Sequence, residues 1–164
     1  MNCPNCGAPI RLVERLGYFT CDYCASTYFP TENQDGVRVL GGKSSANCPL
    51  CRIPLVTAMV AGTRVLACER CRGLLIHQGG FLTTIRALRA WSSAPSLQPR
   101  PIDTEDLQRA IDCPYCQRRM DTHPYAGPGN IVIDNCPECG VNWLDYNELT
   151  RIIRAPGIDR RRWE

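Results

Sequence analysis

Short apolar runs separated by turn residues recur along the chain. The clearest example lies between residues 52 and 67, where two apolar runs flank a turn at Ala61, Gly62 and Thr63. Two such runs joined by a short glycine-containing turn predict a β-hairpin. Residues 10–20 repeat the pattern in a shorter form, with Gly17 at the position of a turn or bulge. We therefore expect a β-rich fold built from small hairpins.

Residues 80–91 instead place their apolar side chains at helical spacing. The stripe consists of Phe81, Leu82, Ile85, Leu88 and Trp91. Arg86 and Arg89 fall off this stripe, on the side that should face solvent. The pattern predicts an amphipathic helix directly after the hairpin.

A second helix is predicted near the C-terminus. Its inward face would be formed by Leu149, Ile152 and Ile153. Asp145 followed three residues later by Glu148 matches a capping box, so Asp145 is the expected N-cap. Pro156 should end the helix, because proline cannot continue the backbone hydrogen bonding.

The twelve cysteines occur only as Cys-x-x-Cys pairs, so none is left over. The pairs are Cys3/Cys6, Cys21/Cys24, Cys48/Cys51, Cys68/Cys71, Cys113/Cys116 and Cys136/Cys139. Taken two at a time they enclose fourteen, sixteen and nineteen residues, a spacing typical of four-thiolate zinc sites. The sequence therefore predicts a small, metal-stabilised β-rich fold of three tandem zinc ribbons, with rubredoxin-like knuckles on β-hairpins and one Zn²⁺ ion in each ribbon, three per chain. The second and third ribbons should each be followed by a short α-helix.

Polar, proline-rich and glycine-rich stretches divide the chain between these ribbons. The expected units are ribbon 1 at 1–30, a linker with a possible strand at 31–47, ribbon 2 plus its helix at 48–91, a linker at 92–112, ribbon 3 plus its helix at 113–155 and an Arg-rich tail at 156–164. Within 92–112, Asp103 or Thr104 could cap a short helix. Ribbon 1 is shorter than the roughly 40 residues that a hydrophobic core alone can stabilise, so metal must supply most of its stability.

Two other uses of the cysteines compete with zinc. A disulfide framework is disfavoured because the first ten residues, MNCPNCGAPI, contain neither region of a secretion signal, which favours a reducing, cytoplasmic location. A rubredoxin-like iron site would use the same four thiolates, so metal analysis is needed to separate iron from zinc. No apolar run reaches the roughly 18 residues that span a bilayer, and we expect no membrane association.

Four thiolates close each predicted site, whereas a catalytic zinc keeps an open position for water or substrate. The only histidines are His77 and His123. His77 follows Cys71 by the same interval that separates Asp145 from Cys139, so we interpret it as a substituted helix N-terminus. His123 is interpreted as a surface-loop residue. No catalytic residue is assigned, and we expect that the protein is not an enzyme.

Ribbon 3 and its helix resemble the bacterial zinc-ribbon domains of the transcription factor IIB type. The matching residues are Cys113, Pro114, Cys116, Cys136, Pro137, Cys139, Gly140, Trp143, Leu144, Asp145, Glu148 and Leu149. Val141 and Asn147 stand where the family pattern has glycine. The resemblance implies a ribbon fold that binds zinc, and it leaves the function open because such ribbons contact both proteins and nucleic acids.

Ribbon 2 resembles the same family in a degenerate form. It keeps Cys48, Pro49, Cys51, Cys68, Cys71, Gly73 and Gly79. Leu75, His77 and Gly80 replace the tryptophan, aspartate and glutamate of the pattern, so its capping box is absent. Ribbon 1 resembles a generic zinc ribbon only.

Zinc binding changes the charge of the chain. The formal charge of +3 counts every cysteine as neutral. A zinc ion with four thiolates carries −2, so the net charge of the chain with three zinc ions is about −3. The basic residues gather in ribbon 2 and the tail, at Arg64, Arg70, Arg72, Arg86, Arg89, Arg160, Arg161 and Arg162.

Two functions fit these observations. The first is a non-enzymatic zinc-binding adaptor or scaffold, in which three modules on flexible linkers contact a protein partner. It is favoured by the charge of the loaded chain and by Leu74, Leu75 and Ile76, which a short ribbon is not expected to bury fully. The alternative is a nucleic-acid-binding or transcription-associated protein that uses the arginines of ribbon 2 and of the tail.

Overall fold

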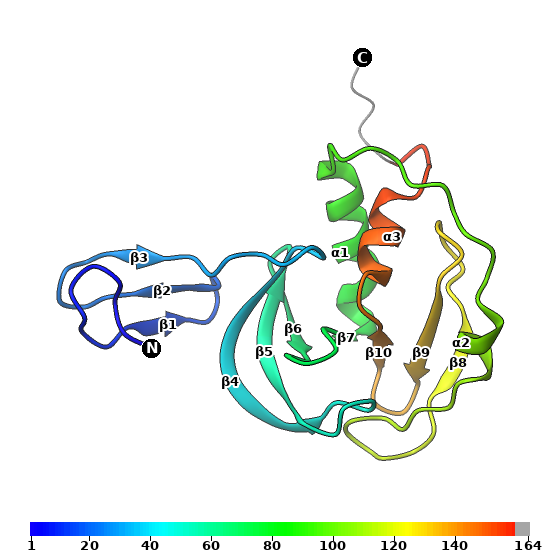
Figure 1. Ribbon diagram of the computed structural model, residues 1–164, viewed down its shortest axis with the longest axis horizontal. Helices are drawn as coiled ribbons and strands as arrows, with labels where there is room; N and C mark the ends of the chain where they lie inside the picture. Colours follow the sequence, from blue (N-terminus) through cyan, green and yellow to red (C-terminus); the bar gives the residue numbers. More distant parts are fainter. Residues whose placement is uncertain (160–164) are drawn as a thin grey trace.

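The computed structural model describes residues 1–159, which form ten strands and three helices (Figure 1). The strands are β1 (Arg11–Val13), β2 (Tyr18–Thr20), β3 (Thr27–Tyr28), β4 (Val37–Asn47), β5 (Pro54–Val60), β6 (Thr63–Ala67), β7 (Leu74–His77), β8 (Asp121–Pro124), β9 (Val132–Cys136) and β10 (Val141–Leu144). The helices are α1 (Gln78–Trp91), α2 (Thr104–Gln108) and α3 (Glu148–Arg154). Arg160, Arg161 and Arg162, which the alternative function would use to bind nucleic acid, lie outside the described residues.

Ribbon 1 forms a separate three-stranded antiparallel sheet in the order β1-β2-β3. Figure 1 shows it projecting from one side of the larger body. Gly17 makes the predicted turn between β1 and β2 with a φ of 66°. A Cβ on this residue would lie 3.1 Å from Cγ of Met59 in β5, so the turn approaches the larger sheet closely.

The remaining strands form one antiparallel sheet in the order β4-β5-β6-β7-β10-β9-β8. The predicted turn between β5 and β6 is confirmed, because Ala61 and Gly62 both have positive φ, as a two-residue hairpin turn requires. Residues 31–47 contribute more than a linker, since β4 pairs with β5 along most of its length. Register shifts on either side of Gly41 bend β4, which accounts for its curve in Figure 1.

The expectation of independent modules on flexible linkers is wrong for ribbons 2 and 3. β7 of ribbon 2 pairs directly with β10 of ribbon 3, and Leu75 lies opposite Trp143. These two residues occupy equivalent positions in the two ribbons, four residues after Cys71 and Cys139. The ribbons are therefore related by a pseudo-twofold axis that passes through this pair.

Trp143 occupies the centre of the junction and is fully buried. Its indole lies against Gly73, where an added Cβ would fall 2.2 Å from Cζ2. The equivalent residue in ribbon 3 is Val141. The two copies are thus complementary: ribbon 2 supplies the small residue that makes room for the large side chain of ribbon 3.

The two faces of the sheet have separate cores. On the helix face, α1 and α3 lie side by side over an aliphatic cluster that includes Leu74, Ile76 and Ile85 (Figure 1). On the opposite, zinc-site face, Leu75 and Trp143 pack with the cysteines of ribbons 2 and 3. The expectation that Leu74, Leu75 and Ile76 remain partly exposed is wrong, because pairing of β7 with β10 buries all three.

α1 confirms the predicted amphipathic helix but begins two residues earlier, after His77 as its N-cap. Leu82 and Trp91 are exposed, although the sequence placed them on the inward stripe. Arg89, predicted to face solvent, is fully buried. Its Nη1 donates hydrogen bonds to the carbonyls of Ile152 at 2.5 Å and Ala155 at 3.0 Å, so it satisfies carbonyls at the end of α3.

The predicted capping box of α3 is only half correct. The Glu148 carboxylate does accept a hydrogen bond from the Asp145 backbone N–H at 2.7 Å, but the helix begins at Glu148 and Asp145 is not its N-cap. The acceptor for this helix end is Asp35. Its buried carboxylate accepts hydrogen bonds from the backbone N–H groups of Asn147 at 2.8 Å and Thr150 at 3.0 Å. A residue before β4 therefore caps a helix of ribbon 3.

The linker between ribbons 2 and 3 crosses the outer strand β8. It contains the predicted short helix α2, whose N-cap Asp103 accepts a hydrogen bond from the Glu105 backbone N–H at 2.9 Å. Among the described residues, no helix has the length and apolar character required to cross a membrane.

The Gly73→Ala substitution tests the packing at the junction. Because the new Cβ would overlap the Trp143 ring, we expect the free energy of unfolding of the zinc-loaded protein to fall by about 3 kcal/mol. Gly79→Ala is the matched control, since a Cβ there meets no atom within 4 Å and lies in the first turn of α1, so we expect no loss of stability. Equal melting temperatures for the two variants would contradict the close Trp143 contact.

The Asp35→Ala substitution tests the remote cap. It leaves the buried N–H of Thr150 and the partly buried N–H of Asn147 without an acceptor, so we expect a loss of about 2 to 3 kcal/mol in thermal or denaturant unfolding. Asp35→Asn keeps one oxygen acceptor and should lose about half as much. Glu32→Gln, at an exposed ion pair with Arg38, should change stability by less than about 0.5 kcal/mol. A loss from Asp35→Ala no larger than that of Glu32→Gln would show that the cap contributes little.

Candidate metal centres

The twelve cysteines form three clusters of four, as predicted. Their members are Cys3, Cys6, Cys21 and Cys24; Cys48, Cys51, Cys68 and Cys71; and Cys113, Cys116, Cys136 and Cys139, with the sulfurs of each cluster within 4.8 Å of one another. All twelve are free thiols. In each cluster the closest sulfurs of opposing knuckles lie 3.5 to 3.7 Å apart.

These distances fit zinc. A tetrahedral ion with zinc–sulfur bonds of about 2.3 Å places its four sulfurs about 3.8 Å apart, whereas a disulfide would bring two of them to about 2.05 Å. The contacts of 3.5 to 3.7 Å therefore match a tetrahedral set of thiolates around one ion. Three four-cysteine sites of this kind accommodate three Zn²⁺ ions per chain.

Each knuckle requires a left-handed backbone after its second cysteine. The six residues at this position are Gly7, Ala25, Arg52, Arg72, Gln117 and Gly140, with φ between 56° and 76°. Only two are glycines, so the turn forms even where the sequence pattern lacks the favoured residue. The conformation directs backbone N–H groups at sulfur, as in the Cys51 N–H donating to the Cys48 thiolate at 3.3 Å. Such hydrogen bonds offset the negative charge of the site.

Without a cation, the crowded thiols differ in their protonation. Burial raises the pKa of the Cys48 thiol to about 11 and that of Cys139 to about 12. Hydrogen bonds from the hydroxyl and the backbone N–H of Ser26 lower the pKa of Cys24 to about 5, which favours its thiolate. A divalent cation provides the charge that allows all four cysteines of a cluster to ionise together, so metal binding must release protons.

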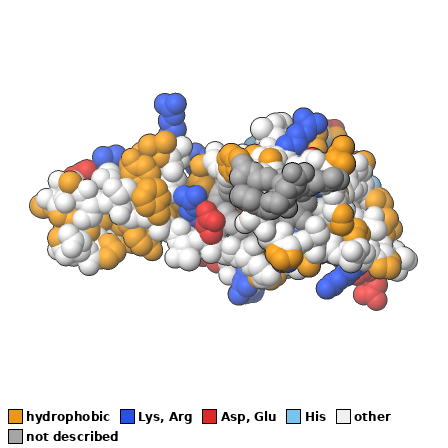
Figure 2. Space-filling view, turned by 90° about the horizontal axis from the view of Figure 1, so that it is seen from above, with side chains coloured by type: hydrophobic (Ala, Val, Ile, Leu, Met, Phe, Trp, Pro, Cys, Tyr) orange, Lys and Arg blue, Asp and Glu red, His pale blue; other side chains and the backbone are white. Residues whose placement is uncertain are grey.

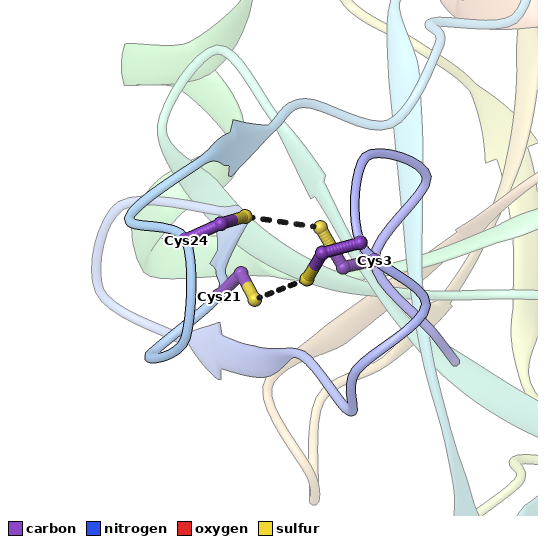
Figure 3. Close-up of side chains that lie close together, drawn as sticks. Cys3, Cys21 and Cys24 are labelled. Atoms are coloured by element: carbon purple, nitrogen blue, oxygen red, sulfur yellow. Dashed lines mark hydrogen bonds between the residues drawn. The ribbon is translucent and has the colours of Figure 1, made fainter.

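The three sites differ in their surroundings. The cysteines of ribbons 2 and 3 belong to the zinc-site-face core with Leu75 and Trp143. Figure 3 shows Cys3, Cys21 and Cys24 of ribbon 1 pointing toward one another from two knuckles. Among residues 1–30, Phe19 and two of the cysteines are the buried apolar side chains, and neither core cluster includes any of them. Ribbon 1 therefore depends on its metal far more than the other two ribbons do.

Neither histidine joins a cluster. His77 is the N-cap of α1, as interpreted from its spacing, and its ring stacks on Tyr115 with centroids 6.4 Å apart. His123 is at the surface as predicted, but it lies in β8 and not in a loop. The described residues place these histidines outside the three metal clusters.

Sequence reasoning missed a polar network beside the third metal site. Arg109, in the linker before ribbon 3, pairs with Asp145 and, at 2.7 Å, with the fully buried Asp134. Asp145 also accepts a hydrogen bond from the Trp143 indole at 2.9 Å. Burial opposes the charge of Arg109, but the two carboxylates outweigh it and raise the pKa of the guanidinium. The signal in the sequence was Asp134, an aspartate directly after the apolar run Ile131, Val132 and Ile133.

Comparison with protein families matches residues 112–155 to the model described as transcription factor zinc-finger. This match covers ribbon 3 with its helix, and neither ribbon 1 nor ribbon 2 lies within it. Searches of curated proteins and of solved structures found no match. The family model and the geometry of the four cysteines thus agree on a zinc ribbon in this part of the chain.

Metal analysis combined with a cysteine variant tests the unequal sites. We expect about three zinc ions per chain by elemental analysis, and two after Cys24→Ser. Because ribbon 1 lies outside both hydrophobic clusters, Cys24→Ser should remove amide protection from residues 1–30 while β5–β7 and β8–β10 stay protected in hydrogen exchange.

Cys139→Ser is the matched comparison, because Cys139 packs against the zinc-site-face core. It should also leave two zinc ions but lower the melting temperature of the whole seven-stranded sheet. Global unfolding by Cys24→Ser would contradict the independence of ribbon 1, and a coloured, iron-containing protein would contradict zinc.

Proposed function

We propose that this chain is a non-enzymatic zinc-binding adaptor whose ribbons contact a protein partner. The zinc ions hold the fold together, and each site is closed by four thiolates that leave no position for a substrate. Their role in this proposal is structural. The surface of the ordered ribbons would then provide the binding.

The observation that carries the proposal is the dispersal of the ribbon 2 arginines over several elements, with Arg72 and Arg89 engaged by other parts of the protein. Arg89 is buried against the end of α3. Arg72 donates a hydrogen bond to the Tyr146 hydroxyl at 3.1 Å and lies 4.9 Å from the centre of its ring. Arg64 forms an ion pair with Glu14 of ribbon 1 at 3.3 Å, but both side chains are largely exposed, so this guanidinium stays accessible. Arg52, Arg70 and Arg86 are exposed too, on the two knuckles and on α1, and single guanidinium groups on different elements make a poor track for a phosphate backbone.

The exposed surface also favours a protein partner. Figure 2 shows lysine and arginine side chains scattered singly among apolar patches on the visible face. On ribbon 1 the large exposed apolar side chains are Met1, Leu16, Tyr23 and Phe29, and Tyr23 is 84% exposed. Apolar side chains gathered on a unit this small are typical of a protein contact surface.

Nucleic-acid binding is the competing function, and a salt titration separates the two. Mixed-sequence DNA and RNA should bind the zinc-loaded chain weakly from about 50 mM to about 200 mM salt, without a steep slope of log affinity against log salt. Arg70→Gln combined with Arg86→Gln should leave that weak binding unchanged. Saturable binding that falls steeply with salt and weakens in the double variant would overturn the adaptor proposal.

The positive test is recovery of a partner. Cross-linked co-purification from the source cells, after nuclease treatment, should yield a protein in a fixed ratio to the zinc-loaded chain. The zinc-stripped chain is the control, because it lacks the ordered ribbons and should not retain that partner.

A further inference from the structure

A cavity of about 150 Å³ opens on the zinc-site face of the large sheet. Its lining includes Arg64, Leu66, Leu75, His77, Tyr115 and Val141. The first four belong to ribbon 2, and the last two belong to ribbon 3. Glu14 of ribbon 1 reaches the rim through its ion pair with Arg64. All three ribbons therefore meet at this cavity.

The pseudo-twofold axis identifies the corresponding place in ribbon 3. In ribbon 2, Leu66 pairs with Leu75 across β6 and β7. In ribbon 3 the equivalent residues, Asp134 and Trp143, pair in the same way across β9 and β10. By the same spacing His77 is equivalent to Asp145. The cavity of ribbon 2 thus corresponds to the region of ribbon 3 around Asp134, Trp143 and Asp145.

In ribbon 3 that region is filled from within the chain. The large indole of Trp143 takes part of the space, and Arg109 from the preceding segment binds both Asp134 and Asp145. Arg109 lies four residues before Cys113, and the residue four before Cys48 is Ser44. Ser44 instead donates a hydrogen bond to the Ala46 carbonyl of its own strand, at 3.2 Å. Ribbon 2 therefore has the corresponding cavity, but the segment before its first knuckle does not enter that cavity.

The chemistry of the open cavity is the reverse of the filled one. Two carboxylates receive a guanidinium in ribbon 3, whereas Arg64, His77 and Tyr115 surround an apolar floor of Leu66 and Leu75 in ribbon 2. All three rim side chains can donate hydrogen bonds, and none of the lining residues is acidic. The complementary ligand carries a carboxylate next to an apolar side chain.

Arg64 already donates to a carboxylate at this rim, that of Glu14 at 3.3 Å. The two side chains are 60% and 66% exposed, so the pair is weak and a second carboxylate can replace it. The volume of about 150 Å³ is below the roughly 300 to 1,000 Å³ of pockets that enclose drug-sized ligands, so one anchoring side chain is the appropriate occupant.

We propose that this cavity is the site where ribbon 2 binds a partner protein, through an apolar anchor residue on Leu66 and Leu75 and an adjacent Asp or Glu carboxylate on Arg64, His77 and Tyr115. The inference rests on the proposed adaptor function and names the site and the chemistry of the partner segment. It assigns to a second chain the place that Arg109 takes within ribbon 3, with the charges reversed.

The direct test uses peptides on the full, zinc-loaded chain. The probe is acetyl-Ala-Leu-Glu-Ala-amide, followed by amide shifts in NMR, and its matched control replaces the glutamate with glutamine. We expect saturable shifts at Leu66, Leu75 and Val141, with about fivefold weaker binding for the glutamine peptide. Absence of saturable shifts at these residues, or equal affinity for the two peptides, would overturn the proposal.

Three variants locate the carboxylate contact. Arg64→Gln should remove the difference between the two peptides, and Glu14→Gln should strengthen binding of the glutamate peptide about twofold to fivefold by freeing Arg64. Arg86→Gln is the matched control, because it removes the same charge from the exposed side of α1. If Arg64→Gln and Arg86→Gln behave alike, the assigned contact is wrong. Zinc content and melting temperature confirm that each variant is folded.

The partner recovered by co-purification separates this site from the adaptor function itself. Retention that falls about fivefold with Arg64→Gln and not with Arg86→Gln supports the site. Unchanged retention overturns the site and leaves the adaptor function standing. A chain that retains no protein and binds nucleic acid with a steep salt dependence overturns the adaptor function, and the salt titration reveals that outcome independently of the peptides.

Discussion

The pairing of β7 with β10 is the interaction on which the larger part of the molecule depends. A single two-stranded hairpin is at best marginally stable in water, and each ribbon has only a few strands of its own. Joining the ribbons edge to edge converts two small sheets into one of seven strands. It also lets α1 and α3 share one aliphatic core on the helix face. The same pairing buries Leu74, Leu75 and Ile76, which an isolated ribbon 2 would leave open.

The two joined copies have diverged in a complementary way. Trp143 fills the centre of the junction because Gly73 leaves room for it, and Arg109 holds the adjacent region of ribbon 3 through two carboxylates. Ribbon 2 has leucine at the positions equivalent to Trp143 and Asp134, so its half of the junction keeps an open cavity. The regular sequence pattern of ribbon 3 and the substitutions in ribbon 2 therefore both belong to one complementary packing arrangement. Ribbon 3, which keeps most of the family pattern, binds Arg109 through its own carboxylates, whereas ribbon 2 places Arg64 and His77 at the edge of a cavity.

The features predictable from sequence were those fixed by residues close together in the chain. The Cys-x-x-Cys spacing determined the three metal clusters, the Ala61-Gly62 turn determined a hairpin, and the spacing of Phe81 and Ile85 determined α1. Features that depend on distant contacts were not accessible. Asp35 caps a helix that begins more than a hundred residues later, and Arg89 binds carbonyls more than sixty residues away. An off-stripe arginine looks solvent-exposed until its partner helix is placed against it.

The three metal sites are unequal in what they support. Ribbons 2 and 3 bury their cysteines in a core that has other apolar members, so metal and packing stabilise the same unit there. Ribbon 1 has no such core, and it touches the large sheet through the close approach of Gly17 to Met59 and the exposed Glu14–Arg64 pair. The order of ribbon 1 therefore comes from its zinc ion, and its placement comes from these two weak contacts, of which the Glu14–Arg64 pair lies at the rim of the ribbon 2 cavity. Loss of that ion would leave the seven-stranded sheet intact but would release the one carboxylate that now occupies Arg64.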